Sequence, residues 1–248
     1  MRCVGPIRAL SAAALSFSGP LPPNHVLPVR RLPSPRAHAT AAGGNTIQKI
    51  YESAAFGDFD SCAVAMDALS PAVAGMAQGD AGGKPGGPVS YHHVHSDAGM
   101  SIGIFVLPPG ARLPLHDHPE MSVLSKLLFG KLRVTSYDLP PDAPPPKRTL
   151  FGFGGGDGRL LRCEPPSVRE VAAPCATLRL DSVRGNIHAF EALEHTAIFD
   201  VLAPPYSDRD GRSCHYYEAD AGHVLREVPW PAELRVVNRP YEGEQVGL

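Results

Sequence analysis

The chain has 248 residues, of which 43% are hydrophobic and 19% are charged, so it carries enough apolar material to build a core. This composition excludes wholesale disorder. The 25 glycines and 27 prolines disfavour long helical bundles and favour short strands joined by turns. A formal net charge of −2 lacks the basic excess typical of nucleic-acid binding. No apolar run reaches the roughly 18 residues of a membrane-spanning helix. From the charge we expect no nucleic acid as a partner, and from the lack of such a run we expect no membrane.

The first part of the chain differs in composition from the rest. Residues 1–51 contain six basic residues and no acidic one, and residues 1–43 are rich in Ala, Ser and Pro. Two interpretations remain open: a disordered basic tail, or a transit peptide, which is Arg- and Ser-rich and poor in acidic residues. The prolines would interrupt an amphipathic helix in this segment. We therefore predict a tail at residues 1–43 and one folded domain at residues 44–248.

Two short helices are expected at the start of this domain. Ile47, Ile50 and Ala54 recur at helical spacing, and Asn45 or Thr46 can cap the N-terminus of the helix. A second helix is predicted over Ala63–Leu69. Residues 71–89 are rich in Gly, Pro and Ala and are expected to form a loop.

From about residue 90 the pattern changes to short strands. Phe129–Gly130 between two apolar runs suggests a hairpin, and loops are expected at residues 139–146 and 152–158. Closely spaced short strands favour an antiparallel sandwich or a small barrel, so the predicted fold is all-β. The predicted strands are Met100–Leu107, Met121–Leu128, Lys131–Tyr137, Thr177–Val183, Ile187–Ala192, Thr196–Leu202, Ser213–Glu218 and His223–Val228.

Three histidines have the spacing of a metal site. His116 and His118 stand at positions i and i+2, which on a strand places both imidazoles on one face, about 6–7 Å apart along the backbone. Imidazole nitrogens on one face can share a metal ion, and His188 is the best candidate for a third ligand from a neighbouring strand. From the pair alone, a surface-exposed or hydrogen-bonded role remains the more common alternative.

These histidines also lie within a recognisable pattern. The segment from Gly110 to Gly130 resembles the first cupin motif, and Gly185 with His188 resembles the core of the second. The resemblance implies a cupin double-stranded β-helix, a jelly-roll barrel, behind the short N-terminal helical segment. Val123 stands where the motif has its glutamate ligand, which leaves three neutral imidazoles. The second motif departs from the pattern at Val183 and Ala192.

Seven short blocks carry a closer resemblance, spread between about residues 46 and 241. They are Ser101–Phe105, Leu107–Gly110, Pro114–Pro119, Ser125–Gly130, Ser136–Asp138, Gly185–His188 and Asp200–Tyr206. With them the chain resembles the plant cysteine oxidases, which are relatives of cysteamine dioxygenase. Leu139 replaces the tryptophan expected after Ser-Tyr-Asp.

The resemblance implies an Fe(II)-dependent thiol dioxygenase with His116, His118 and His188 as ligands. The implied reaction adds both atoms of O2 to the N-terminal cysteine of a regulatory protein and gives a sulfinic acid. That product enters the N-degron route, so hypoxia spares the substrate. Two alternatives stay open: small aminothiols (cysteamine or free cysteine) as substrates, or a non-catalytic metal-binding cupin. The implied location is cytoplasm and nucleus, with plastid or mitochondrion as the alternative through residues 1–43, and we expect a monomer.

The resemblance also suggests roles for four further residues. Asp200, on an apolar strand, is expected in the pocket near the substrate amine or the open metal positions; a structural salt bridge or turn hydrogen bond is the alternative. Tyr206 is expected to place its hydroxyl at the pocket mouth, with a packed core tyrosine as the alternative. Cys214 and Tyr216 match positions that can become covalently linked in the cysteamine dioxygenase branch, although an ordinary buried thiol is the more common case.

Other polar residues are expected to carry no chemistry. Glu120 falls outside the ligand spacing and is interpreted as solvated or as a neighbour of the ligands. His215 is expected to face away from Cys214 and Tyr216 on its strand. A second histidine cluster lacks a matching carboxylate or cysteine and is interpreted as a solvated strand or loop: His92, His93 and His95.

Overall fold

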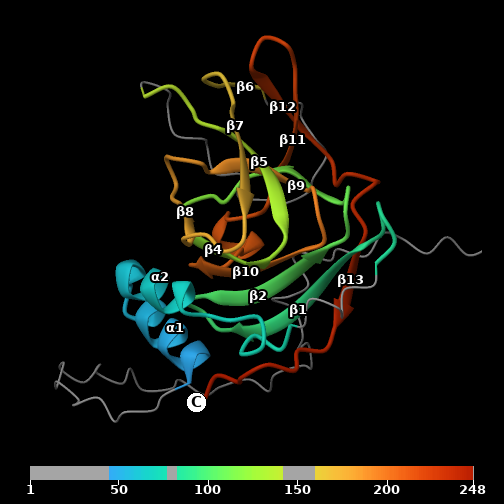
Figure 1. The fold of residues 1–248 in the computed structure, drawn as a ribbon. Helices are drawn as coiled ribbons and strands as arrows, with labels where there is room; N and C mark the ends of the chain where they lie inside the picture. Colours follow the sequence, from blue (N-terminus) through green and yellow to red (C-terminus); the bar gives the residue numbers. More distant parts are fainter. Residues whose placement is uncertain (1–44, 77–82, 142–159, 248) are drawn as a thin grey trace, which may run out of the picture.

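The computed structural model describes residues 45–76, 83–141 and 160–247. The predicted tail at residues 1–43 and the Gly-rich loop at residues 152–158 lie outside these ranges. Within the described ranges, two helices precede a body of strands, as Figure 1 shows. The all-β expectation and the short N-terminal helical segment are therefore confirmed.

The strands form two sheets, and the chain passes from one sheet to the other several times. The first sheet has the order β13 (Val236–Arg239), β1 (Val89–Ser96), β2 (Ser101–Leu107), β10 (Thr196–Ala203), β4 (Ser122–Phe129) and β8 (Leu178–Leu180). The second has the order β6 (Leu160–Arg162), β12 (Val224–Val228), β11 (Tyr216–Ala219), β3 (Arg112–His116), β9 (Ile187–Ala192), β5 (Lys131–Tyr137) and β7 (Ser167–Ala172). All pairs are antiparallel except β1 with β13.

The inner faces of the two sheets enclose an apolar cluster. Leu127 and Ile198 of the first sheet pack with Leu132 and Phe190 of the second, and all four are buried. Side chains on a strand alternate between the two faces of its sheet, so each strand contributes every second residue to this interior. The two sheets thus form the double-stranded barrel that the resemblance to the cupins implies.

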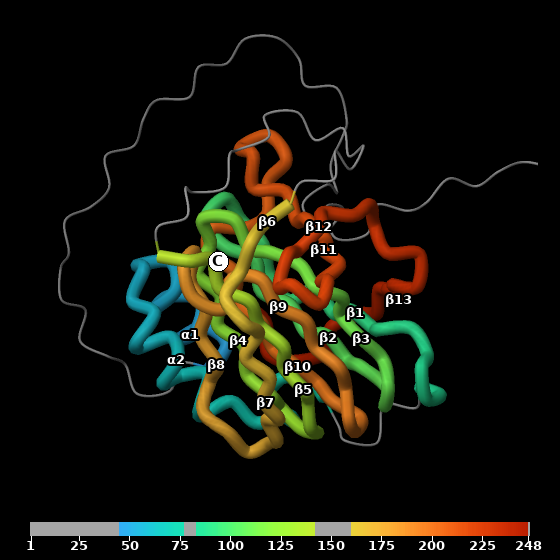
Figure 2. Tube along the Cα trace, turned by 90° about the horizontal axis from the view of Figure 1, so that it is seen from above, coloured from blue at the N-terminus to red at the C-terminus, as the bar shows by residue number. Residues whose placement is uncertain are grey.

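The two helices cover the outer face of the first sheet. α1 (Thr46–Ala55) and α2 (Phe59–Asp67) lie together at one side of the strands in Figures 1 and 2, and Ile50 and Met66 share a buried cluster with Phe199 of β10. The first helix matches its prediction, because the Asn45 side chain accepts a hydrogen bond from the Gln48 amide at 2.6 Å. The second begins earlier than predicted.

The early start of α2 has a local cause. The Asp58 carboxylate accepts from the Ser61 amide at 3.0 Å and caps the helix, so Phe59–Ser61 belong to it. The prediction of Ala63–Leu69 missed this cap and ran past Asp67, the last helical residue.

The predicted hairpin at Phe129–Gly130 is wrong. β4 pairs with β10 and β8, whereas β5 pairs with β9 and β7, so the two strands belong to different sheets. Gly130 has a φ of +88°, and a Cβ there would lie 2.1 Å from the His195 carbonyl oxygen. A left-handed residue without a side chain lets the chain turn from one sheet into the other.

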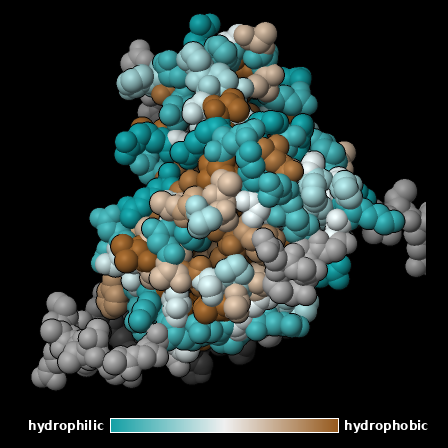
Figure 3. Space-filling model, in the orientation of Figure 1, coloured by the Kyte–Doolittle hydropathy of each residue, from teal (hydrophilic) through white to brown (hydrophobic). Residues whose placement is uncertain are grey.

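The surface mixes polar and apolar residues, as the face in Figure 3 shows. Phe56, Val64 and Val183 are among the exposed large hydrophobic side chains. Exposed apolar residues of this kind are ordinary on a folded domain. In the described part of the chain, none of the helices is long and apolar enough to cross a membrane.

Candidate metal centre

The three predicted histidine ligands meet inside the barrel. His116 ends β3 and lies directly opposite His188 of β9, while His118 stands two residues beyond the end of β3. The three rings have centroid separations of 4.8–4.9 Å. One nitrogen from each ring falls within a group whose atoms all lie within 4.8 Å of one another. The shared strand face predicted for His116 and His118 is corrected, because the chain leaves β3 before His118.

Two of the rings are held by main-chain oxygens. His116 Nδ1 lies 2.8 Å from the Pro114 carbonyl oxygen, and His188 Nδ1 lies 3.2 Å from the Gly185 carbonyl oxygen. Carbonyl oxygens only accept, so each Nδ1 must carry the proton and donate it. The Nε2 lone pair of each ring is then free to bind a metal ion.

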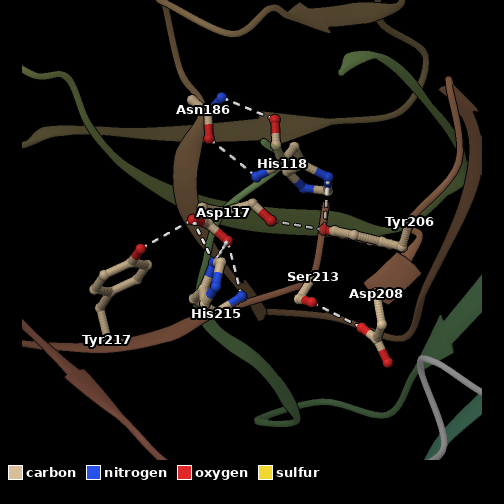
Figure 4. A network of polar contacts seen from close by, with 8 residues as sticks. All are labelled: Asp117, His118, Asn186, Tyr206, Asp208, Ser213, His215 and Tyr217. Atoms are coloured by element: carbon tan, nitrogen blue, oxygen red, sulfur yellow. Dashed lines mark hydrogen bonds and ion pairs between the residues drawn. The ribbon is translucent and has the colours of Figure 1, made fainter. Parts of the chain in front are cut away.

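The third ring is held by a tyrosine. The Tyr206 hydroxyl lies 2.8 Å from His118 Nδ1 and donates to the Asp117 carbonyl oxygen at 2.7 Å (Figure 4). Because the hydroxyl proton goes to that carbonyl, Nδ1 of His118 donates to the tyrosine oxygen. His118 Nε2 is buried without a hydrogen-bond partner among the described residues. A buried lone pair beside two similar nitrogens fits a metal ion.

Burial keeps these ligands uncharged. It lowers the pKa of His116, lowers that of His118 well below its usual value, and lowers that of His188 to about 3. For His118 and His188 the neighbouring imidazoles lower the pKa further. The group is therefore neutral near pH 7, the form that coordinates a cation.

The turn that carries His118 is fixed by an asparagine. Asn186 Oδ1 accepts from the His118 amide at 2.9 Å, and Asn186 Nδ2 donates to the His118 carbonyl oxygen at 2.9 Å (Figure 4). This reciprocal pair joins the loop before His188 to the turn after His116. It sets the spacing of ligands that lie far apart in the sequence.

A cavity of about 40 Å³ opens onto the three imidazoles. Its walls are mostly apolar and include Phe105, Val123 and Leu202. Val123, which occupies the position of the motif's glutamate, thus faces the site with an aliphatic side chain. Among the described residues that line this cavity, Asp200 is the only acidic one and none is Lys or Arg.

Asp200 lines this pocket. It is buried on β10, opposite Ser125 of β4, and its Oδ1 has no hydrogen-bond partner in the described structure. Burial raises the pKa of Asp200 to about 7, against a smaller lowering by the Ser125 hydroxyl. No salt bridge to Asp200 exists within the described residues, and its hydrogen-bonding partner there is the Ser125 hydroxyl.

A tyrosine lies close to this carboxyl group. Gly103 of β2 stands opposite Asp200, and a Cβ on Gly103 would lie 2.6 Å from the Tyr91 hydroxyl oxygen. Absence of a side chain at Gly103 therefore admits the Tyr91 ring. Burial raises the pKa of Tyr91 to about 12, and the charge of Asp200 contributes to that rise.

The other predicted site residues surround the cavity. Tyr206 lines the cavity, and its hydroxyl bonds to His118 beside the metal centre, where the prediction placed it at the pocket mouth. Tyr216 also lines the cavity, and its buried hydroxyl has the Cys214 thiol as a polar neighbour. Cys214 is a free thiol that interacts with both hydroxyls, and burial raises its pKa to about 12. The Cys214–Tyr216 link stays a prediction.

Within the described residues, the remaining histidines form no second group of metal-ligand type. His116, His118 and His188 are the one group of metal-ligand type found in the described ranges. Glu120 is exposed. The other cluster lies on β1, as the solvated-strand interpretation expects: His92, His93 and His95.

Three residues of the site were missed from the sequence. The motif gives Asp117 no role between its two ligands, and Asn186 enters only within the block Gly185–His188. Tyr91 carried no signal at all. A polar residue enclosed between two buried ligands, as Asp117 is, could have been predicted to need partners.

The site can be compared with known proteins. A family model described as PCO_ADO matches residues 63–246. "Plant cysteine oxidase 2" of Arabidopsis thaliana is 45% identical over 130 residues, which cover 52% of this chain and 44% of that protein. "2-aminoethanethiol dioxygenase" of Homo sapiens is 36% identical over 190 residues, which cover 64% of this chain and 68% of that protein. The chain spans less than half the length of the two Arabidopsis relatives it matches.

Solved structures of cupins are also similar to this chain. An RmlC-like cupin from Desulfovibrio desulfuricans has 18% identity and a TM-score of 0.32, with 48% of this chain and 84% of that chain covered. A cupin superfamily protein from Desulfitobacterium hafniense has 12% identity and a TM-score of 0.32, with 46% and 76% covered.

Proposed function

The chain belongs to the PCO_ADO family, and from this premise we propose that it is an Fe(II)-dependent thiol dioxygenase acting on an N-terminal cysteine. The observation that carries the proposal is the group of three buried, neutral imidazoles with an aliphatic residue at the glutamate position. Neutral ligands leave the dipositive charge of the ion uncompensated, which favours an anionic thiolate. Bound iron would bring the thiolate and O2 together, and both oxygen atoms would end on sulfur, so the reaction needs no external reductant.

The residues around the ion prepare the site for this reaction. His116, His118 and His188 each keep a proton on Nδ1, which leaves Nε2 for the ion. The apolar walls, Val123 and Leu202 among them, restrict water near the reacting sulfur.

Asp200 is proposed to orient the substrate amine. A buried carboxyl group with a pKa near 7 ionises readily when an ammonium group arrives, because the opposite charge favours the carboxylate. Its unpartnered Oδ1 is an acceptor for that ammonium group. The amine would thus be held at a fixed distance from the three imidazoles.

The charges of the cavity select among thiols. Free cysteine carries a carboxylate, and the described residues that line this cavity include no Lys or Arg to receive it. A peptide beginning with cysteine has a neutral amide in place of that carboxylate, and cysteamine has only hydrogen at this position. We therefore place N-terminal cysteine first and cysteamine second, the latter supported by relatives named 2-aminoethanethiol dioxygenase.

The physiological role is proposed from the family. An N-terminal sulfinic acid would direct a regulatory protein into the N-degron route, which makes its survival depend on oxygen. We propose this role in cytoplasm and nucleus. The test compares fluorescent fusions of the full chain and of residues 44–248: import of the full chain alone into plastid or mitochondrion would contradict this location.

One experiment tests the reaction and its substrate together. The iron-loaded full chain is given a Cys-initiated peptide, its N-acetylated form, cysteamine or free cysteine, each with and without air, and product masses are recorded. We expect the mass of two added oxygen atoms only in air, largest for the free-amine peptide and small for the acetylated one. Oxidation of cysteamine alone would move the substrate, and bound iron without oxidation of any thiol would leave a non-catalytic binding protein.

A further inference from the structure

Asp117 lies between two of the metal ligands and carries a buried carboxylate that the proposed reaction does not use. It is 7% exposed. Its oxygens accept from the His215 amide at 2.8 Å, from His215 Nδ1 at 3.1 Å and from the Tyr217 hydroxyl at 2.9 Å (Figure 4). A carboxylate buried this deeply needs such donors to remain charged.

All these donors come from one short segment. His215 and Tyr217 alternate with Cys214 and Tyr216, and the second pair faces the cavity side, where Tyr216 lines the wall and Cys214 meets its hydroxyl. Asp117 therefore binds one side of the segment Cys214–Tyr217, and the other side of this segment forms part of the wall around the metal centre.

The main chain alone holds this segment weakly. β11 and β3 share a single register pair, Tyr216 with His116, whereas β11 pairs with β12 over four residues. Beyond that pair, the Asp117 amide donates to the His215 carbonyl oxygen at 3.2 Å. The side chain of Asp117 adds contacts to the His215 amide, His215 Nδ1 and the Tyr217 hydroxyl, which join the ligand turn to this wall.

The ligands themselves have separate supports. Asn186 holds the main chain of His118, Tyr206 holds its ring, and carbonyl oxygens hold the other two rings. Loss of the Asp117 contacts should therefore displace the wall more than the ligands.

We propose that Asp117 is a positioning residue that fixes Cys214 and Tyr216 against the metal centre. It acts through His215 and Tyr217 and contacts neither the ion nor the substrate. The inference deepens the proposed function, because it assigns the placement of one wall of the same cavity, yet its test does not depend on turnover.

The test measures the reactivity of Cys214 in the full chain. Asp117→Asn keeps the size of the side chain but replaces one accepting oxygen by an amide group. Iodoacetamide labelling of each cysteine is followed by peptide mass analysis, with Cys175, which has the same intermediate exposure as Cys214, as the internal reference. We expect Cys214 to react about tenfold faster in Asp117→Asn, since a charged hydrogen-bonding partner is lost. Iron content should stay within about twofold of the wild type, and kcat should fall more than KM changes.

Two further variants keep the test decisive. Tyr217→Phe removes one neutral donor and should raise Cys214 labelling about threefold, even if Asp117→Asn fails to fold. Asp220→Asn loosens the opposite end of the β11–β12 pair, where Asp220 accepts from the Gly222 and Val224 amides, and should leave Cys214 unchanged.

Three results would overturn the inference. Wild-type labelling in both Asp117→Asn and Tyr217→Phe would show that the contacts position nothing. Cys214 labelling in Asp220→Asn as fast as in Asp117→Asn would indicate general loosening of the strands. Iron loss parallel to the labelling would place the effect on the ligands. If no thiol is oxidised by the wild type while the labelling pattern holds, the proposed function fails and the positioning stands.

Discussion

The two faces of β10 serve different purposes. On the outer face, Phe199 and Val201 are 0–1% exposed and pack in the cluster that contains the two helices. On the inner face, Ile198 packs in the barrel interior, and Asp200 and Leu202 line the cavity. Because side chains alternate along a strand, one residue of displacement separates a purely stabilising position from one in the site.

β4 repeats the same division. Leu124 and Leu128 face the helices in the outer cluster, while Val123 and Ser125 line the cavity. The outer face packs mainly apolar side chains against the helices, and its buried Lys126 is paired with Asp67 of α2 at 3.3 Å, whereas the inner face places polar groups beside the three histidines. Substitutions on opposite faces should therefore separate stability from chemistry, and the largest effect is expected at a ligand.

His188→Ala should abolish the metal site with little harm to the fold. It removes one of three neutral ligands, so iron affinity and thiol oxidation should each fall at least roughly a thousandfold. Metal analysis by mass spectrometry and a thermal unfolding scan measure the two properties. Unchanged iron content in the variant would contradict the assignment.

Phe199→Ala on the outer face of β10 should do the opposite. Removing a fully buried aromatic side chain costs about 3–5 kcal/mol of unfolding free energy. The iron bound per folded molecule should not change, because the ring faces away from the cavity. Denaturant unfolding and metal analysis of the same preparation check both statements, and iron loss at full stability would break the comparison between the faces.

Asp200→Asn should make metal-free protein more stable at alkaline pH. The pKa is about 7 in the folded state against an ordinary 3.8, so between these values the unfolded chain releases a proton that the folded chain keeps. Stability of the wild type therefore falls as pH rises through this window, by up to about 4 kcal/mol, and the variant lacks this loss.

Unfolding by denaturant at pH 4 and pH 8 measures the effect of Asp200→Asn. The variant should gain on the wild type between these pH values, while oxidation of the free-amine peptide should weaken mainly through KM. An equal difference in stability at both pH values would show that Asp200 titrates normally.

Tyr206→Phe should have the smallest effect. The variant keeps the ring but loses the hydroxyl that accepts a hydrogen bond from His118 Nδ1. Removing a partner that orients a metal ligand typically lowers metal affinity by about 10–100-fold. Tyr51→Phe, which removes a surface hydroxyl bonded to Asp97, is the matched control and should leave affinity unchanged. Competition with a chelator measures both, and equal affinities for the two variants would contradict the role of Tyr206.

The same contrast explains what could be read from the sequence. Local patterns predicted β2, β9 and β10 almost to the residue, because apolar runs ended by turn residues carry their own boundaries. They failed at Gly130, where a tight turn looks identical whether the next strand returns to the same sheet or enters the other. The pairing that decides this is long-range and leaves no local signal.

The site followed a similar rule. His116, His118 and His188 were predictable because metal ligands need particular residue types at particular spacings. Other contacts depend on which loops meet in three dimensions. These are the contacts of Asp117 with His215 and Tyr217, and the two hydrogen bonds between Asn186 and the main chain of His118. Such contacts are invisible until the sheets are assembled.

The central claim is that this three-imidazole centre transfers both atoms of O2 to a thiol. The most direct measurement supplies the iron-loaded chain with a Cys-initiated peptide under O2 labelled with heavy oxygen, and reads the isotopes in the product. The account predicts a sulfinic acid with two labelled oxygen atoms on sulfur. A peptide that stays unoxidised, or one whose added oxygen comes from water, would contradict it.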